Sequence, residues 1–453
     1  MSHAPLNPDR RAALIGGAAL AAAPHALAAW PWRGLEPMAL KPVRPVVWKD
    51  FLGVNAQFQW FPDAVARKQV ERLKALGLNW VRLGLHWMLL EPEEGQFQLE
   101  PIDRMMALVR EAGLRNVTYV VGTPRYASSV AKGDAYERFF DKFPPRNPAV
   151  LAQRLGMLAR RYPQVDVWQV WNEPNLIGFW APQPDTEAYG RLFVPAYQAL
   201  RAAAPDKPVA LAGMAYFSEI DRRGGLMIQE LARLGAFNLN PIVAYHPYTA
   251  TAEGSDQDAR DFVKRVVPAH QWLRSAGVRQ VWATEWGWSS YPGPKEEQPI
   301  VGEDGQADLT LRRLALMAAL DYDRVFLFTL ADLDERATRR DQHYGLLRRN
   351  GEPKPVYHAL QRFLQLCGPA LQPAAPPTIL GQAPDGLITI GWRRGDGRPL
   401  WMLWAREPGE VQLKGVSQAT VHQPLSGGER PLKDAGEGVR VPVTTALQIV
   451  LGA

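Results

Sequence analysis

The chain has 453 residues, of which 47% are hydrophobic and 22% charged, a composition that excludes large-scale disorder. Its length suits one large domain with a small one, or two to three domains of medium size. The net charge of +6 comes from 52 basic and 46 acidic residues, and this small, dispersed excess argues against a nucleic-acid partner.

The amino terminus resembles an export signal. Arg10-Arg11 precede an apolar stretch, Ala12–Ala23, and Ala26-Leu27-Ala28 matches an Ala-x-Ala cleavage pattern. We therefore expect residues 1–28 to be a signal peptide and the mature protein to be periplasmic or secreted. The paired arginines suggest the twin-arginine route, with general secretion and a retained membrane anchor as alternatives.

From about residue 50, short apolar runs alternate with helical patterns. Residues 29–50, rich in Trp and Pro, are expected to wrap the domain that follows. Helices end in patterns such as Glu111-Ala112-Gly113, where glycine can take the left-handed conformation that closes a helix. Eight runs are predicted to be buried parallel strands: Leu52–Gln57, Trp80–Leu85, Asn116–Val121, Val165–Val170, Val209–Gly213, Ile242–Tyr245, Gln280–Thr284 and Val325–Thr329.

Eight strands with intervening helices predict an α/β fold, a (β/α)₈ TIM barrel at residues 51–368. The rival, a doubly wound nucleotide-binding sheet, would need a Gly-rich turn after its first strand, and Leu52-Gly53-Val54-Asn55 offers none. After a Pro-rich connector at Pro369–Pro377, short alternating runs predict a small antiparallel β-sheet or β-sandwich domain at residues 369–453.

Two glutamates flanked by Trp stand out against this pattern. Glu173 lies in Trp171-Asn172-Glu173-Pro174-Asn175 and Glu285 in Thr284-Glu285-Trp286-Gly287-Trp288, each after a predicted strand. Functional groups of such barrels gather where strands end. A carboxylate in this position is poorly explained by folding alone, and two of them suggest a pair that converges on a sugar.

Other polar residues follow the strands in the same way. Those with candidate roles are Asn55, Arg82, Asn172, Gly213, His246-Pro247-Tyr248 and Asp332. His246 could equally be a core histidine and Arg82 an ordinary ion-pair partner. Glu91, in a Pro-containing loop, is expected to be solvated or to cap a helix.

These motifs resemble clan A glycoside hydrolases, and within them glycoside hydrolase family 39. The matching segments are Val81-Arg82, Trp87 with Leu90-Glu91-Pro92, Trp171–Leu176 with Phe179-Trp180, His246-Pro247-Tyr248 and Thr284–Gly287. The resemblance covers residues 50–365 and implies that Glu173 is the acid/base and Glu285 the nucleophile. Many clan members have Trp at the end of strand eight, where this chain has Phe328-Thr329, so substrate identity does not transfer.

Simple chemistry agrees with these roles. Burial beside Trp and Pro favours a protonated Glu173, and hydrogen bonds from Arg82 and the Tyr248 hydroxyl would favour an ionised Glu285. Asn172 could bond the sugar 2-hydroxyl. His246 completes the expected binding residues together with tryptophans whose faces could stack on sugar rings: Trp87, Trp180, Trp286 and Trp288.

The sequence thus predicts a retaining glycoside hydrolase that acts on a bacterial polysaccharide. Aromatics on several loops favour endo action along an open groove: Trp60, Trp87, Tyr126, Trp180, Trp288 and Tyr291. The alternatives are an exo-acting β-xylosidase-like enzyme and a non-catalytic glycan-binding barrel of a secretion complex. Resemblance to PslG-type exopolysaccharide hydrolases implies a link to an exopolysaccharide synthesis complex. We expect a monomer without cofactor or metal; the single cysteine, Cys367, excludes a Cys-based site.

Overall fold

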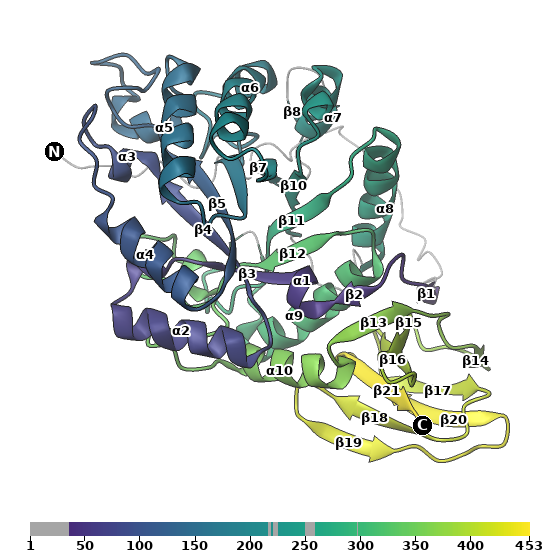
Figure 1. Ribbon diagram of the computed structural model, residues 1–453. Coiled ribbons are helices and arrows are strands. Elements are labelled where there is room, and N and C mark those ends of the chain that lie inside the picture. The colour runs from purple at the N-terminus through teal and green to yellow at the C-terminus, as the bar shows by residue number, and fades with distance from the viewer. Residues whose placement is uncertain (1–35, 216–218, 221–224, 250–258, 297) are drawn as a thin grey trace, which may run out of the picture. The chain divides into compact units, whose positions relative to one another are not determined.

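A closed barrel of parallel strands forms the larger part of the protein (Figure 1). The computed structural model describes residues 36–215, 219–220, 225–249, 259–296 and 298–453, so the predicted signal peptide lies outside the described residues. Around the barrel the strands are β3 (Leu52–Ala56), β4 (Trp80–His86), β5 (Arg115–Val121), β6 (Val167–Asn172), β7 (Val209–Ala215), β10 (Val243–His246), β11 (Val281–Trp286) and β12 (Arg324–Leu327). The predicted fold is confirmed, and each strand begins and ends within two residues of its predicted bounds.

Helices surround the strands. They are α1 (Trp48–Phe51), α2 (Asp63–Ala75), α3 (Trp87–Leu90), α4 (Glu100–Glu111), α5 (Pro148–Arg161), α6 (Thr186–Ala203), α7 (Met227–Arg233), α8 (Ala259–Ser275), α9 (Gly302–Ala319) and α10 (Pro355–Cys367). Helix α4 ends as its sequence predicts, with Gly113 at φ 66°. Helix α5 begins at a proline, and the Asn147 side chain accepts a hydrogen bond from the Ala149 amide.

Shorter elements join the larger ones. The 3₁₀ turns are η2 (Phe58–Trp60), η3 (Glu137–Lys142), η4 (Ala236–Leu239) and η5 (Asp341–His343), and β8 (Glu219–Ile220) pairs with β9 (Gly225–Leu226). Within the described residues, no helix has both the length and the apolarity required to cross a bilayer.

Large side chains fill the barrel interior at its amino-terminal end. Trp80, Trp282 and Phe326 form one buried cluster with smaller residues from β5, β6 and β7 and with Ile242, which directly precedes β10. Trp282 lies 6.2 Å from Trp80 and 5.9 Å from Phe326, measured between ring centroids. The interior is therefore packed at this end, and a site must lie at the opposite end, where the strands finish.

Two antiparallel sheets form the carboxyl-terminal domain. The larger has the order β19-β18-β21-β16-β15-β13-β2, and the smaller has the order β14-β17-β20. The bounds are β13 (Ala370–Pro373), β14 (Ile379–Leu380), β15 (Ile388–Arg394), β16 (Pro399–Trp404), β17 (Gly409–Lys414), β18 (Ala419–Gln423), β19 (Gly428–Pro431), β20 (Gly438–Val443) and β21 (Gln448–Gly452). Side chains of both sheets share one apolar cluster, as in a β-sandwich.

The segment before the barrel differs from expectation, because it joins this domain. β1 (Met38–Leu40) pairs in parallel with β15, and β2 (Val46–Val47) pairs with β13. The sequence predicts that residues 29–50 wrap the barrel and that residues 369–377 form a connector. Strand pairing explains both differences, since β2 and β13 are backbone partners of each other and β1 pairs with β15.

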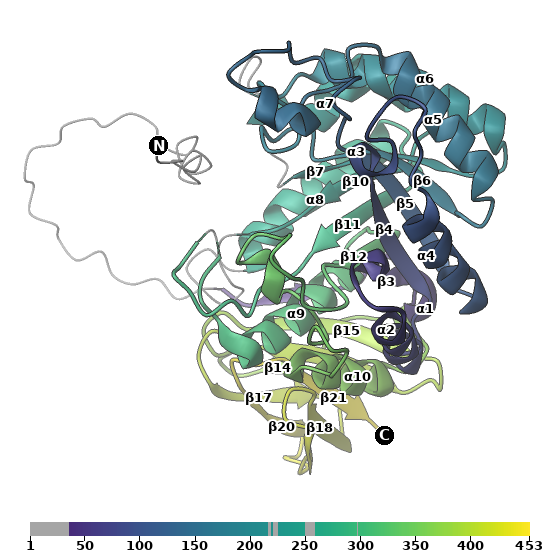
Figure 2. The same ribbon diagram turned by 90° about the vertical axis from the view of Figure 1, so that its left-hand side faces the viewer.

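Helix α9 links the domain to the barrel. Every residue from Gln306 to Ala319 is buried, which is typical of a helix covered on all sides. Its Asp308 carboxylate accepts a hydrogen bond of 2.9 Å from the Leu447 amide of the carboxyl-terminal domain. Figure 2 shows α9 and α10 between the barrel strands and the sandwich.

Candidate active site

The two Trp-flanked glutamates lie at one end of the barrel. Glu173 directly follows β6, and Glu285 belongs to β11. Trp171 and Glu173 have φ angles of 75° and 40°, which side chains with a Cβ rarely adopt. The Glu173 amide donates to the Gly213 carbonyl on β7 at 3.0 Å and holds this turn in place. Backbone strain of this kind is often found at functional sites.

The two carboxylates are close together and largely buried. Glu173 is 8% exposed and Glu285 is 9% exposed. One carboxylate oxygen of each residue and one nitrogen of His246 all lie within 4.8 Å of one another. Retaining glycosidases need carboxyl groups about 5–5.5 Å apart, whereas inverting enzymes need roughly 6.5–9.5 Å to admit a water. Carboxylate oxygens this close favour the shorter, retaining separation over the inverting one.

Arg82, on β4, joins the residues around the nucleophile candidate. Its guanidinium pairs with Glu285 at 2.5 Å and donates to the Asn172 amide oxygen at 2.8 Å and the Asn55 amide oxygen at 2.9 Å. It also lies 4.0 Å above the centre of the Tyr119 ring. Arg82 is buried, so its charge is balanced by Glu285 rather than by water. It is therefore an ion-pair partner inside the site.

His246, at the end of β10, bridges the two glutamates. Its Nδ1 lies 2.8 Å from Glu173 Oε1 and 3.6 Å from Glu285 Oε2. Burial, together with the Arg82 charge, lowers the pKa of His246 to about 3, although Glu285 acts in the opposite direction. The imidazole is therefore neutral at ordinary pH. His246 belongs to the site and is fully buried.

Gly213 makes room for this histidine. A Cβ at Gly213 would lie 2.0 Å from His246 Nε2, far inside the closest contact that two heavy atoms allow. Glycine is therefore required at the end of β7 on steric grounds, because a side chain there would collide with the His246 ring.

The cluster of Glu173, His246 and Glu285 has a spacing at which a cation could be held. The Arg82 guanidinium already supplies a positive charge in direct contact with Glu285. A metal ion beside it would meet electrostatic repulsion, so these residues do not fit a metal well. The expected absence of a metal stays a prediction.

The four tryptophans predicted to stack on sugar rings are buried, with no more than 2% of each residue exposed: Trp87, Trp180, Trp286 and Trp288. Trp180 packs edge-on against Trp171 at 5.5 Å and Tyr189 at 5.9 Å. The Trp87 ring nitrogen donates to Glu91 at 2.9 Å. The stacking prediction is wrong for these four, because their ring faces contact protein rather than open space. Trp180 packs against Trp171 at the end of β6, and Trp286 directly follows Glu285 on β11.

Two further expectations concern Tyr248 and Glu91. Tyr248 is partly exposed and packs edge-on against Tyr344 at 6.1 Å; its predicted hydrogen bond to Glu285 stays a prediction. Glu91 is not solvated, because it is fully buried and accepts two hydrogen bonds, of 2.7 and 2.8 Å, from Arg154. Burial alone would raise its pKa, but the hydrogen bonds from Arg154, Trp87 and Gly95 outweigh this and lower the pKa of Glu91.

Two polar residues of the site, Gln169 and Thr284, were not predicted from the sequence to have a functional role. Gln169, in the middle of β6, accepts a hydrogen bond of 2.7 Å from Arg82 Nε. The Thr284 hydroxyl lies 3.0 Å from His246 Nε2. The available signal was a glutamine inside an otherwise apolar buried strand, since buried polar groups need partners.

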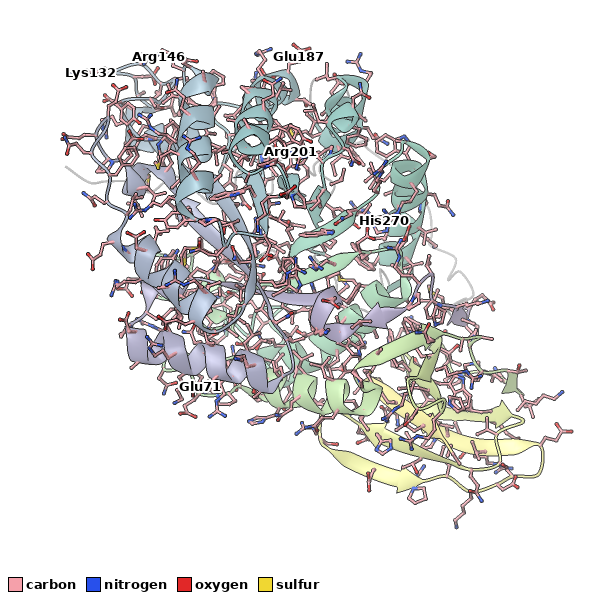
Figure 3. All side chains as sticks on the ribbon, viewed as in Figure 1. Glu71, Lys132, Arg146, Glu187, Arg201 and His270 are labelled. Carbon is pink, nitrogen blue, oxygen red and sulfur yellow. The ribbon has the colours of Figure 1, made fainter. Side chains whose placement is uncertain are left out.

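A second buried histidine lies outside this site. His270, labelled in Figure 3 on α8, places its Nε2 2.6 Å from the Tyr245 hydroxyl. Tyr245 and His246 are neighbours on β10 and point to opposite faces of the strand. His270 therefore holds the outer face of β10, and His246 serves the inner face.

A family model described as Cellulase (glycosyl hydrolase family 5) matches residues 41–307. A solved family 39 glycoside hydrolase from Bacteroides cellulosilyticus WH2 is similar, with 18% identity and a TM-score of 0.65 over 90% of this chain and 82% of that one. A monomeric β-xylosidase from Caulobacter crescentus CB15 gives 16% identity and a TM-score of 0.61 over 92% and 99%. At this identity the two structures show a common fold, a barrel with a carboxyl-terminal β domain.

A curated relative, a β-galactosidase from Xanthomonas manihotis, is 30% identical over 79 residues. That match covers 17% of this chain and only 13% of the relative. So short a match does not assign the activity of the relative to this chain.

Proposed function

Because the chain belongs to the family Cellulase (glycosyl hydrolase family 5) of clan A, it is a glycoside hydrolase, and we propose that it cleaves a bacterial polysaccharide internally with retention of anomeric configuration. The observation that supports the retaining mechanism is the closeness of the two buried carboxylates, one oxygen of each lying within 4.8 Å of the other. The clan predicted from the sequence is confirmed, and the likeness to family 39 extends to the fold.

In this proposal Glu285 attacks the anomeric carbon while Glu173 protonates the departing glycosidic oxygen. A covalent glycosyl–enzyme intermediate forms, and water then cleaves it with Glu173 acting as the base. The contact with the Arg82 guanidinium fixes the Glu285 carboxylate in one orientation. His246 contacts Glu173 as a neutral imidazole, so it brings no positive charge next to the acid.

Asn172 is suited to bind the sugar beside the acid. Its amide oxygen accepts from Arg82 at 2.8 Å, so the amide NH₂ group is the part that can donate to a hydroxyl. A hydrogen bond to the 2-hydroxyl strengthens as the oxocarbenium-like transition state forms. Arg82 therefore orients both the nucleophile and a sugar-binding amide.

Endo action rests on aromatic side chains at the strand-end loops. Trp60, Tyr126 and Tyr291 are partly exposed after β3, β5 and β11, and Tyr136 is 54% exposed after β5. The Arg336 guanidinium lies 4.4 Å over the Trp60 ring, so one face of that ring is occupied. Aromatics spread over several loops suit contacts along a chain better than a single closed pocket.

The size of the first products tests the endo proposal. Purified protein incubated with a panel of bacterial polysaccharides is expected to release oligosaccharides several sugars long at early times, measured by size-exclusion chromatography and mass spectrometry. The Glu285→Gln variant serves as the blank. A monosaccharide as the sole early product would replace the endo proposal with the exo-acting, β-xylosidase-like alternative and leave the glutamates in place. Binding without turnover would favour a non-catalytic barrel.

Export gives a separate prediction. We propose that the mature protein is periplasmic or secreted, on the strength of residues 10–28. Association of a monomer with an exopolysaccharide synthesis complex is proposed from the resemblance to PslG-type hydrolases alone. Amino-terminal sequencing of protein from the native periplasm or medium should then start near Ala29. Intact Met1 on a membrane-bound form would favour an uncleaved anchor instead. Replacing Arg10-Arg11 by lysines should block export only if the twin-arginine route is used.

A further inference from the structure

A chain of buried hydrogen bonds runs beneath the two glutamates. It starts at Arg82, whose Nε donates to Gln169 Oε1 at 2.7 Å. The Gln169 amide nitrogen lies 3.4 Å from the Thr284 hydroxyl and 3.0 Å from the Leu211 carbonyl. The Thr284 hydroxyl in turn contacts His246 Nε2 at 3.0 Å.

The orientation of Gln169 follows from its contact with Arg82 and favours one direction for the remaining hydrogen bonds. Arg82 can only donate, so Gln169 must turn its amide oxygen toward the guanidinium. Its NH₂ group then faces Thr284, and the Thr284 oxygen is the acceptor. The Thr284 hydroxyl hydrogen can then donate to Nε2 of His246, an arrangement in which Nε2 carries the lone pair and Nδ1 the hydrogen.

We propose that Gln169 and Thr284 are positioning residues that hold His246 as the Nδ1–H tautomer and so place the acid's proton on Oε2 of Glu173. The Nδ1–H group, 2.8 Å from Glu173, donates to Oε1. Because the carbonyl oxygen of a carboxylic acid is its better acceptor, the acidic hydrogen belongs on the other oxygen. This inference rests on the proposed acid role of Glu173.

The consequence for catalysis is a fixed donor atom. The proton on Oε2 passes to the glycosidic oxygen as its bond to the anomeric carbon breaks, and Glu285 forms the new bond to that carbon. The opposite tautomer would let the Glu173 hydrogen point at the imidazole, where it cannot reach the leaving group. The carboxylates of Glu173 and Glu285 lie beside the ring nitrogen Nδ1, the Arg82 charge acts on the ring from farther away, and burial keeps the ring neutral.

The tautomer can be measured without any substrate. In protein labelled with ring-¹⁵N histidine, the ¹⁵N shifts of a neutral imidazole distinguish the protonated nitrogen from the acceptor nitrogen. The signal of His246 among the eight histidines is assigned by its loss in His246→Gln. We expect Nδ1–H in the wild-type protein. A wild-type signal of Nε2–H would overturn the proposal by itself.

Gln169→Glu provides the sharpest variant. A carboxylate accepts on both oxygens, so Thr284 would donate to it and then accept from His246. We expect the tautomer to switch to Nε2–H, whereas a merely structural role for Gln169 would leave Nδ1–H unchanged. Thr284→Val should yield a mixture of tautomers, and Thr284→Ser should restore Nδ1–H.

The matched control is Thr118→Val. Thr118 is another fully buried barrel threonine, and its hydroxyl donates to Asn116 rather than to this chain of hydrogen bonds. It should keep the Nδ1–H signal. The kinetic readout is kcat/KM, which in Gln169→Glu should fall by roughly tenfold or more on poor leaving groups and little on activated aryl glycosides. Failure of the wild-type protein to hydrolyse any glycan would remove the proposed function but leave the spectra interpretable.

Discussion

Replacing Glu285 by glutamine is expected to abolish turnover while the fold stays intact. Glutamine has the same shape but lacks the nucleophilic carboxylate, so the covalent route is lost. We expect kcat to fall by about 10⁴-fold or more, since single nucleophiles in other hydrolases carry effects of this order. Initial rates on the natural polysaccharide, with the melting temperature of both proteins, provide the measurement.

Glu91→Gln is the matched control for this substitution. Glu91 is also a buried glutamate paired with an arginine, but it lies outside the catalytic pair. Each substitution should lower the melting temperature, because an arginine (Arg82 or Arg154) loses its charged partner, but only Glu285→Gln should abolish turnover. A mechanism-based fluorosugar should label Glu285 alone. Labelling of Glu173 would mean that the two roles are reversed, and substantial residual activity of Glu285→Gln would refute the nucleophile assignment.

Glu173→Ala is expected to act selectively on the two chemical steps. Loss of the general acid should slow cleavage of poor leaving groups by about 10²–10⁴-fold. Activated aryl glycosides need little protonation, so the glycosyl–enzyme should still form on them. Its hydrolysis should then be slow, because no base activates the water. Burst kinetics on an aryl glycoside would show this accumulation.

Azide tests the same variant at the second chemical step, the breakdown of the glycosyl–enzyme. The small anion can occupy the space left by the carboxylate and attack the intermediate without a base. A glycosyl azide of retained configuration is the expected product, with a rate that rises with azide concentration. If azide neither raised the rate nor formed this product, Glu173 would not be the acid/base.

Local sequence patterns sufficed to predict the barrel and to single out the two glutamates that lie together in it. Buried parallel strands are apolar along their whole length, and Gly113 marks a helix end, so strand and helix boundaries can be read along the chain. The two glutamates could be recognised in the sequence because a carboxylate directly after an apolar strand is unfavourable in the buried surroundings that such a strand predicts. Both signals depend on near neighbours in the chain.

Contacts distant in sequence decided the rest. The tryptophans were expected from the sequence to stack on sugar rings. Trp180, however, packs against Trp171 and Tyr189, and these contacts cannot be predicted from the order of residues. Strands β1 and β2 joined a sheet whose other strands lie more than 300 residues later.

The chain of hydrogen bonds beneath the glutamates is equally non-local. Arg82, Gln169, Thr284 and His246 come from four different strands, and their partners are set by the closure of the barrel. The sequence by itself therefore determined which residues are chemically exceptional, because local burial and polarity conflict there. The tertiary structure alone decided which of them meet, because hydrogen-bond direction and ring burial depend on atoms brought together from the whole barrel.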